Sequence, residues 1–199
     1  MKNHFQRGNP ILLIMGVLIV FICSCKKDPP LTFNIYPGVA IGDFKLGDNL
    51  QTLKSHITET SGTKASFLVN GSYWHLLKYN QPGIGFFLET NSMTLNNTDI
   101  PHAIYAFSPF DGNTEKGITF GSLLTEVAKQ YGVPNQITSD GSYYYTNSLG
   151  IAFWADDTKT KVDEIYITKP GSSKNGEIIF FKQLEFANEK SILFNDTEK

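Results

Sequence analysis

The sequence predicts an α+β fold built from two tandem repeats, each a helix followed by an antiparallel meander of strands. Three observations predict it: a pattern that recurs along the chain, apolar residues that alternate within the recurring segments, and an abundance of strand-favouring aromatic residues (15 Phe, 9 Tyr and 2 Trp). The repeats are expected at residues 38–110 and 111–170, forming one curved sheet with the helices on one face.

Each repeat is expected to open with a helix. Residues 44–53 read FKLGDNLQTL and residues 118–127 read ITFGSLLTEV, an offset of 74 positions. A glycine in each block is followed by Asp48 or Ser122, whose side chains can accept a hydrogen bond from the first helical turn. Apolar residues then recur at helical spacing, so a helix is predicted after both caps.

The strands recur in the same order as the helices. Residues 83–87 (GIGFF) match residues 150–154 (GIAFW) at an offset of 67, and residues 103–109 match residues 164–170 at an offset of 61. The offset shrinks along the chain, as expected if the second copy has shorter loops.

The expected strands of the first copy are 65–70, 73–79, 83–89 and 102–107, and those of the second are 135–138, 142–147, 150–155 and 162–168. Within the C-terminal segment 171–199, residues 178–181 are expected to add a closing strand ahead of a polar tail.

Residues 1–24 have the features of a secretory signal peptide. A start with two basic and no acidic residues precedes an apolar run at 11–22, about 18 Å long as a helix and shorter than the ~30 Å hydrocarbon core of a bilayer. Residues 22–25 (ICSC) resemble the lipobox of bacterial lipoproteins, in which a small residue such as Ser24 precedes the acylated cysteine. Cleavage before Cys25 and lipidation of Cys25 are therefore predicted; an uncleaved membrane anchor is the alternative.

The mature chain would be one domain held to a membrane by its lipid. Residues 25–37 begin with lysines and prolines and are interpreted as an extended tether. Removing residues 1–24 takes away two of the 17 basic residues and none of the 19 acidic ones, so the net charge becomes −4 and nucleic acid is not an expected partner. Cys25 would be the only cysteine left, which excludes an internal disulfide. The expected location is the bacterial cell envelope, at the outer membrane, facing the periplasm or the surface.

The repeat pattern resembles known protein families. The capped helices, the Tyr-Gly-Val-Pro exit at residues 131–134 and the aromatic meander are similar to the fold of the beta-lactamase inhibitor protein and, in single copy, to the SmpA/OmlA outer-membrane lipoproteins. The resemblance covers residues 38–170 and implies helices on one face of a curved sheet, an open opposite face and no catalytic residues. The first copy departs from the pattern, because no Gly-x-Pro exit follows Ile57.

Strand parity predicts which side chains point away from the helices. Ile84, Phe86, Ile151 and Phe153 would lie under the helices, so their neighbours along the strands must point the opposite way. The opposite surface is then expected to carry seven aromatic rings: Trp74, Phe87, Tyr105, Tyr143, Tyr145, Trp154 and Tyr166. Large amphipathic rings dominate binding hot spots, so a partner-binding face is predicted.

Two alternatives to an exposed ring surface stay open. The rings could be buried, either between the repeats or under the C-terminal segment, which contains Phe180, Phe181 and Phe186. A register error of one residue would also exchange the two faces of a strand.

No catalytic residue, metal site or cofactor is predicted. His56, His75 and His102 have no metal-ligand spacing and are interpreted as surface or satisfied core residues. Residues 111–115 begin like a calcium loop, but Ser122 stands where a bidentate glutamate is required, so a turn between the repeats is predicted instead.

Two further acidic positions are interpreted structurally. Residues 156–159 are predicted to form a solvated hairpin tip, and the adjacent Asp163 and Glu164 would face opposite sides of a strand.

Three functions follow as hypotheses. The first is a non-catalytic binding or assembly module whose ring surface receives a protein loop, a peptide or a sugar polymer. The second, implied by the resemblance, is a protein inhibitor of a secreted or envelope enzyme. The third is an enzyme acting on cell-wall polymers, which would require two carboxyl groups converging in a cleft beside a raised pKa.

Overall fold

A computed structural model of the chain describes residues 33–58, 61–176, 178–179 and 192–195. Contacts divide the chain into Met1–Leu31 and Thr32–Lys199, and every described residue belongs to the second unit. The predicted signal peptide, Cys25 and the first eight residues of the predicted tether therefore lie outside the described residues.

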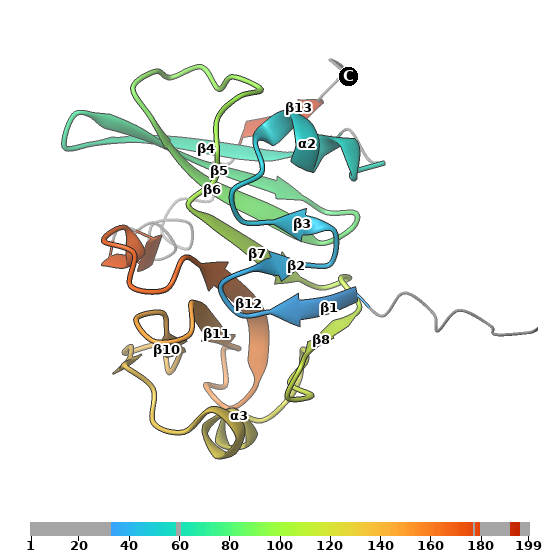
Figure 1. Cartoon of the computed structure of the whole chain (residues 1–199), viewed down its shortest axis with the longest axis vertical. Coiled ribbons are helices and arrows are strands. Elements are labelled where there is room, and N and C mark those ends of the chain that lie inside the picture. Colours follow the sequence, from blue (N-terminus) through green and yellow to red (C-terminus); the bar gives the residue numbers. More distant parts are fainter. Residues whose placement is uncertain (1–32, 59–60, 177, 180–191, 196–199) are drawn as a thin grey trace, which may run out of the picture. The chain divides into compact units, whose positions relative to one another are not determined.

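The larger sheet has nine strands in the order β13-β4-β5-β6-β7-β12-β11-β10-β9, and all the neighbours are antiparallel (Figure 1). The first copy supplies β4 (Ser61–Val69), β5 (Ser72–Tyr79), β6 (Ile84–Thr90) and β7 (Ala103–Phe107). The second copy supplies β9 (Gln136–Ile137), β10 (Tyr143–Tyr145), β11 (Ile151–Ala155) and β12 (Val162–Thr168). Each of these eight strands overlaps a predicted one.

The closing strand is not where the sequence predicted it. Ile178 and Ile179, the described part of the predicted strand 178–181, are helical. The strand that closes the sheet is β13 (Ile192–Asn195), which pairs with β4.

A second sheet contains four short strands in the order β3-β2-β1-β8. Its strands are β1 (Phe33–Tyr36), β2 (Ala40–Ile41), β3 (Phe44–Lys45) and β8 (Gly112–Thr114), and β1 runs parallel to β8. Residues 33–36, predicted as tether, and residues 112–114, predicted as a turn, are thus strands. Because β1 to β3 precede the first helix and β8 precedes the second, this sheet joins the two copies.

Both predicted helices are present but short: α2 (Leu50–Ser55) and α3 (Leu124–Tyr131). Each begins one residue later than its predicted cap implied. Asn49, rather than Asp48, accepts the hydrogen bond from the Thr52 backbone N–H at 3.0 Å. In α3 the cap position is Leu123, whose backbone N–H donates to the Glu126 carboxylate at 3.1 Å.

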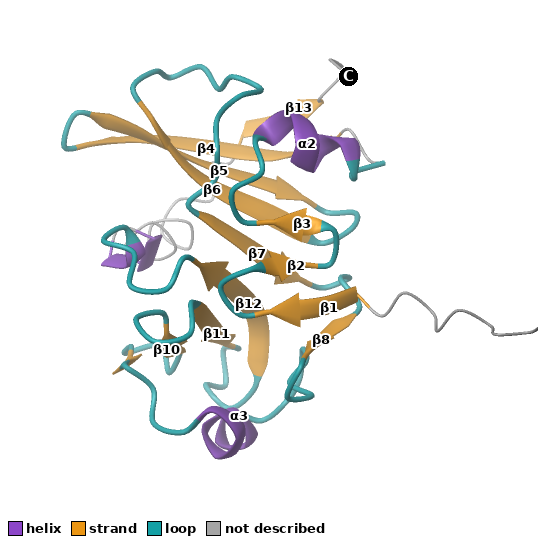
Figure 2. Ribbon diagram, in the orientation of Figure 1, coloured by secondary structure: helices purple, strands orange, loops and turns teal. Residues whose placement is uncertain are grey.

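The predicted α+β class is wrong: the described fold is mostly β, with two sheets, the two short helices α2 and α3, and helical residues at 175–176 and 178–179 (Figure 2). Helices of six and eight residues cannot cover one face of a nine-stranded sheet. The four-stranded sheet provides the missing cover, because Ile35, Ile41 and Phe44 belong to the same buried cluster as the apolar side of the large sheet.

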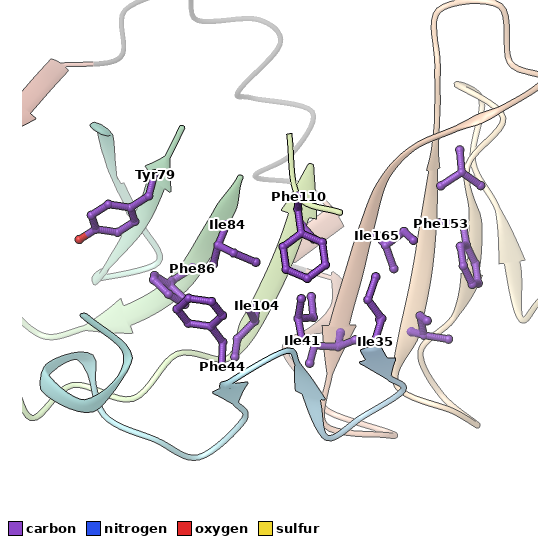
Figure 3. Packing of buried hydrophobic residues seen from close by; sticks show 14 of the residues in the cluster. Ile35, Ile41, Phe44, Tyr79, Ile84, Phe86, Ile104, Phe110, Phe153 and Ile165 are labelled. Atoms are coloured by element: carbon purple, nitrogen blue, oxygen red, sulfur yellow. The ribbon is translucent and has the colours of Figure 1, made fainter. Parts of the chain in front are cut away.

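We call this buried cluster, which includes Ile35, Ile41, Phe44 and Phe86, the inner cluster. It is the main core of the domain. Figure 3 shows Phe44 of β3 beside Phe86 of β6, and Ile35 of β1 below Ile165 of β12. The rings of Phe44 and Phe86 lie 6.0 Å apart, centre to centre. The inner cluster therefore holds the two sheets together by apolar burial.

The strand pairing is compatible with the duplication, which stays a prediction. Strands β7 and β12 pair so that Tyr105 lies opposite Tyr166, its equivalent at an offset of 61, as a local two-fold axis requires. The first helical N–H groups are also satisfied equivalently: Leu50 donates to the Asp99 carbonyl and Leu124 to the Thr160 carbonyl, both at 2.9 Å. Asp99 and Thr160 are again 61 residues apart.

Candidate functional site

The side of the large sheet opposite the inner cluster carries a second buried cluster, which we call the ring face. Its members come from six strands of both copies and from the C-terminal segment: Trp74, Leu76, Phe87, Ala103, Tyr105, Phe107, Tyr144, Ala152, Trp154, Tyr166 and Ile178. The rings of Tyr105 and Tyr166 stack at its centre, 5.1 Å apart and 14° from parallel.

Five of the seven predicted rings lie together on the ring face, and two do not. Trp74, Phe87, Tyr105, Trp154 and Tyr166 are its members. Tyr143 and Tyr145 instead pack against the inner cluster on the other side, so the predicted parity of β10 is wrong. The residue between them, Tyr144, takes the ring-face position.

A sequence signal could have given the correct parity of β10. The segment Asn-Gly-Ser-Tyr-Trp at residues 70–74 matches Asp-Gly-Ser-Tyr-Tyr at residues 140–144, at an offset of 70 between the offsets of the helices and the later strands. This match aligns Trp74 with Tyr144. A slip of one residue exchanges the faces of a strand.

The expected exposure of the rings is also wrong. The five predicted rings on the ring face are 0–4 % exposed, Tyr145 is 1 % exposed, and Tyr143 is half-buried. The alternative was that the C-terminal segment covers the rings. The described part of that segment agrees with this alternative, because Ile178 belongs to the ring face. Phe180, Phe181 and Phe186 lie outside the described residues.

An ion pair joins the C-terminal segment to the first copy. The Lys174 ammonium lies 2.6 Å from a Glu89 carboxylate oxygen and 5.7 Å from the centre of the Trp74 ring. The same carboxylate lies 3.6 Å from the His102 ring nitrogen. The hydrogen bond from Lys174 lowers the pKa of Glu89. These contacts hold the segment across the edge of the ring face.

Polar groups fix the rings from within the chain. The Trp154 indole N–H donates to the Asp140 carboxylate, which also accepts the Ser142 hydroxyl at 2.7 Å. The Tyr166 hydroxyl donates to the buried Glu164 carboxylate at 2.8 Å. The polar groups of Trp154 and Tyr166, two of the predicted rings, thus form hydrogen bonds within the chain.

A small cavity lies between the C-terminal segment and the second copy. Its volume is about 10 Å³, and its polar lining includes Thr146, Thr168 and the buried Asn175, whose side-chain amide has no hydrogen-bond partner. A cavity of this size holds a single water molecule. This cavity is too small for a peptide or a sugar.

Asp140 gives a prediction for the pH dependence of stability. Burial alone would raise its pKa, but hydrogen bonds from Thr138, Ser142 and Trp154 outweigh burial and place the pKa below its ordinary value. A lowered pKa means that the ionised carboxylate stabilises the fold above the unfolded-state pKa of about 3.9, and that this contribution is lost as the pH falls through the lower, folded-state value.

We expect Asp140→Asn to lower the free energy of unfolding by about 1–2 kcal/mol at pH 7 in urea titrations, because a charged acceptor is lost. The difference from the wild type should shrink below about pH 4. Asp157→Asn, on an exposed hairpin tip, is the control and should leave stability unchanged. A difference that is constant down to pH 2 would show that the charge of Asp140 is not responsible.

The remaining predicted polar positions are placed as follows. Asp156 accepts hydrogen bonds from the backbone of Thr160 and Lys161, which confirms the hairpin tip. Asp163 is exposed and Glu164 buried, so they face opposite sides as predicted. Within the described ranges, no group of three or more His, Cys, Asp or Glu side chains is placed to hold a metal ion.

His75 is a buried histidine whose two ring nitrogens are both satisfied, as the sequence predicted. Its Nδ1 lies 2.9 Å from the Ser66 hydroxyl, and its Nε2 lies 3.1 Å from the Ser92 carbonyl. The carbonyl can only accept, so Nε2 carries the proton and Ser66 donates to Nδ1. Burial lowers the pKa of His75 and so favours this neutral form. The ring fixes the loop after β6 to the β4–β5 hairpin, a role that no sequence pattern indicated.

The β4–β5 hairpin also carries an exposed apolar side chain that the sequence did not predict. Leu68 is 62 % exposed and lies opposite the half-buried Tyr73, which lies opposite Thr90. Met93, just beyond the Ser92 carbonyl that contacts His75, is 65 % exposed. We call Leu68 and Tyr73, which lie opposite each other on β4 and β5, the hairpin patch.

The two copies differ most at this hairpin. Strands β4 and β5 have nine and eight residues, whereas their equivalents β9 and β10 have two and three. The hairpin extends to one side of the sheet in Figure 1, and β1 begins on the other. Because the second copy folds with a short hairpin, the elongation in the first is not a requirement of the fold.

Comparison of the chain with protein-family models, with curated proteins and with solved structures gives no match. The resemblance to the inhibitor and lipoprotein families therefore stays a prediction. Across the described part of the chain, no helix has the length and apolar character needed to cross a membrane.

Proposed function

We propose that this chain is a lipid-anchored protein of the bacterial envelope that acts as a non-catalytic binding module, and that the hairpin patch contacts its partner. The observation that carries the proposal is that Leu68 is 62 % exposed. It lies near the end of a hairpin that is much longer than its equivalent in the other copy. Exposed apolar side chains that serve no internal packing mark interaction sites when they occur together.

The predicted anchor suits this surface. From Cys25 to Phe33 the chain advances eight residues, which reach at most about 28 Å, so lipidation would keep the domain close to the membrane. The start of β1 and the end of the β4–β5 hairpin lie on opposite sides in Figure 1. The hairpin patch would then face away from the membrane, toward partners in the periplasm or outside the cell.

The chemistry of the patch favours a protein or peptide over a sugar polymer. Sugars are expected to stack on exposed aromatic rings, whereas the rings of the ring face are buried. An exposed aliphatic side chain beside a half-buried tyrosine suits an apolar protein surface. The predicted net charge of −4 also gives no reason to expect nucleic acid.

The test replaces Leu68 by the photo-crosslinking residue p-benzoylphenylalanine in the native envelope. We expect one dominant protein adduct, because the patch would lie against the partner. Val133, which is 91 % exposed in the second copy, is the matched control position and should give no such adduct. Equal adducts from both positions would contradict the proposed site. An adduct with a secreted hydrolase, whose activity falls on binding, would favour the inhibitor alternative.

The anchor has its own test. Mass spectrometry of the N-terminal peptide should show an acylated Cys25, and Cys25→Ser should move the protein from the membrane fraction to the soluble fraction. An unmodified Cys25 with residues 1–24 still attached would contradict the lipoprotein assignment.

A further inference from the structure

His75 joins the β4–β5 hairpin to the loop between β6 and β7, residues 91–102. The Ser66 hydroxyl approaches the ring from β4 and lies 2.9 Å from Nδ1. On the other side of the ring, the Thr90 hydroxyl and the Ser92 carbonyl lie 3.0 and 3.1 Å from Nε2. The Thr90 hydroxyl donates to the same carbonyl, so its oxygen is left to accept from the ring. One imidazole therefore holds the first residues of the loop against the hairpin.

The far end of this loop is attached to α2. The carbonyls of Asn97 and Asp99 accept the backbone N–H groups of Gln51 and Leu50, both at 2.9 Å. The loop thus covers the first turn of the helix, whose N–H groups have no partner within the helix. Because the contact with His75 fixes the other end, it decides how firmly the loop is held.

The contacts of His75 suit the neutral imidazole. Nδ1 accepts from Ser66 and Nε2 donates to the Ser92 carbonyl, whereas an imidazolium ion donates from both nitrogens. Protonation would place two donors face to face at Nδ1 until the Ser66 hydroxyl turned away. The residue is 1 % exposed, so the new charge would also be buried. Both effects favour a structure in which the protonated ring leaves its site.

The charged and titratable groups around His75 do not compensate for this burial. Burial is the largest effect, and it lowers the pKa of His75 below its ordinary value of about 6.5. The Ser92 carbonyl and Asp99 of the loop favour the charged ring, whereas Lys64 of β4 disfavours it. On β5, the Tyr73 ring stacks on the imidazole, 6.5 Å away and 21° from parallel.

We propose that His75 is a pH-sensitive switch, which holds the β6–β7 loop against the hairpin when it is neutral and releases the loop when the surroundings become acidic. Release would also remove the ring on which Tyr73 of the hairpin patch stacks, and so weaken partner binding there. This consequence rests on the proposed function and deepens it by naming a regulation of the same site. The proposed location outside the cytoplasm would expose the switch to the pH of the medium.

Linkage gives the sign and the size of the effect. In the open form, with the loop released, the solvated ring recovers its ordinary pKa of about 6.5, whereas the pKa in the closed form is lower. The open form therefore binds the proton more tightly, and acid favours it. The ratio of open to closed forms is constant above about pH 6.5. It rises by up to about tenfold per pH unit below that, until the pH reaches the closed-form pKa.

The test uses Met93 as a reporter of the loop, because it directly follows Ser92 and is the only methionine in residues 25–199. The full-length mature protein is labelled with ¹³C at the methionine methyl group, and NMR spectra are recorded from about pH 7.5 to about pH 5. We expect the Met93 methyl resonance to shift with the same midpoint as the ring protons of His75, below about pH 6.5.

Three substitutions make the test specific. His75→Gln should abolish the Met93 transition, because an amide can accept from Ser66 and donate to Ser92 without titrating. Ser66→Ala keeps the histidine but removes the donor to Nδ1, so the midpoint should move up toward about pH 6.5. His56→Gln is the control, because His56 is exposed, and it should leave the transition unchanged.

Several results would overturn the switch. They are a Met93 resonance that stays constant down to about pH 5, the same shift in His75→Gln, or a His75 midpoint at or above about pH 6.5. The photo-crosslink at Leu68 tests the consequence for binding, since its yield should fall severalfold at acidic pH in the wild type but not in His75→Gln. A yield that is independent of pH while Met93 titrates would exclude the coupling to the patch. No adduct at any pH would contradict the proposed function, while the Met93 titration would still decide the switch.

Discussion

Gly150→Ala is expected to lower the free energy of unfolding by about 3 kcal/mol or more. Gly150 has φ +72°, in the left-handed region, where a side chain costs about 1–2 kcal/mol. A Cβ there would also overlap the Thr168 carbonyl oxygen and lie 2.9 Å from Gly38 Cα. These neighbours are backbone atoms that cannot rotate away, so a steric cost of about 1–3 kcal/mol adds to the first. Urea denaturation measures the sum.

The matched control is Gly117→Ala, which separates the two costs. Gly117 has a similar φ, +78°, but a Cβ there would meet nothing within 4 Å. It should therefore lose only the conformational cost of about 1–2 kcal/mol. Equal losses in both variants would show that the close approach of Gly150 to β12 contributes nothing.

Gly150 also shows why so much of the larger sheet could be predicted from sequence. It and Gly83 recur at an offset of 67, and each accepts through its carbonyl the backbone N–H of its partner strand, from Thr168 and Phe107 respectively, at 2.9 Å. If the segment is duplicated as predicted, each turn and strand pattern occurs twice in the sequence. A pattern that occurs twice is less easily a chance one. The predicted strand 162–168 matches β12 residue for residue.

The small sheet could not be predicted in the same way. Strands β2 and β3 have two residues each, too few for an alternating pattern to be seen. They are strands because β1 pairs with β2 and β2 with β3, and because Ile41 and Phe44 reach the inner cluster. The α+β class followed from assigning that cover to helices.

Two features of the ring face cannot be predicted from the alternation of side chains along the strands. The first was the register of β10, where a tight turn at Asp140 and Gly141 decides which tyrosine faces which side. The second was the origin of the cover over the rings. Ile178, which contacts the ring face, lies 12 residues after Tyr166 in the sequence. No local pattern indicates which side of the sheet this segment will cover.

The elongated hairpin became visible only by comparing the copies in three dimensions. Strand β4 was predicted to begin at residue 65 but begins at Ser61, because pairing with β13 and β5 extends it through a polar stretch. Exposure of Leu68 is likewise a tertiary property, since apolar residues in a strand are normally assigned to the core.

Trp154→Ala is expected to cost about 3–5 kcal/mol of the free energy of unfolding. The ring is 4 % exposed, lies edge-on to Tyr166 at 5.3 Å and donates its indole N–H to Asp140. Truncating a buried tryptophan of this kind leaves a cavity and removes one of the hydrogen bonds to the Asp140 carboxylate. For a domain of this size the thermal midpoint should fall by about 10 °C or more in calorimetry.

Tyr143→Ala is the comparison variant. Together the two variants test whether the ring face is a buried core or a binding surface. Tyr143 is half-buried on the other side of β10 and should lose much less stability than Trp154. If the rings instead formed a binding surface, Trp154→Ala would abolish partner capture and leave the midpoint nearly unchanged. The structure predicts the reverse: loss of stability from Trp154, and loss of capture from Leu68→Lys at an unchanged midpoint. A stable Trp154→Ala protein that no longer captures its partner would return the binding site to the ring face.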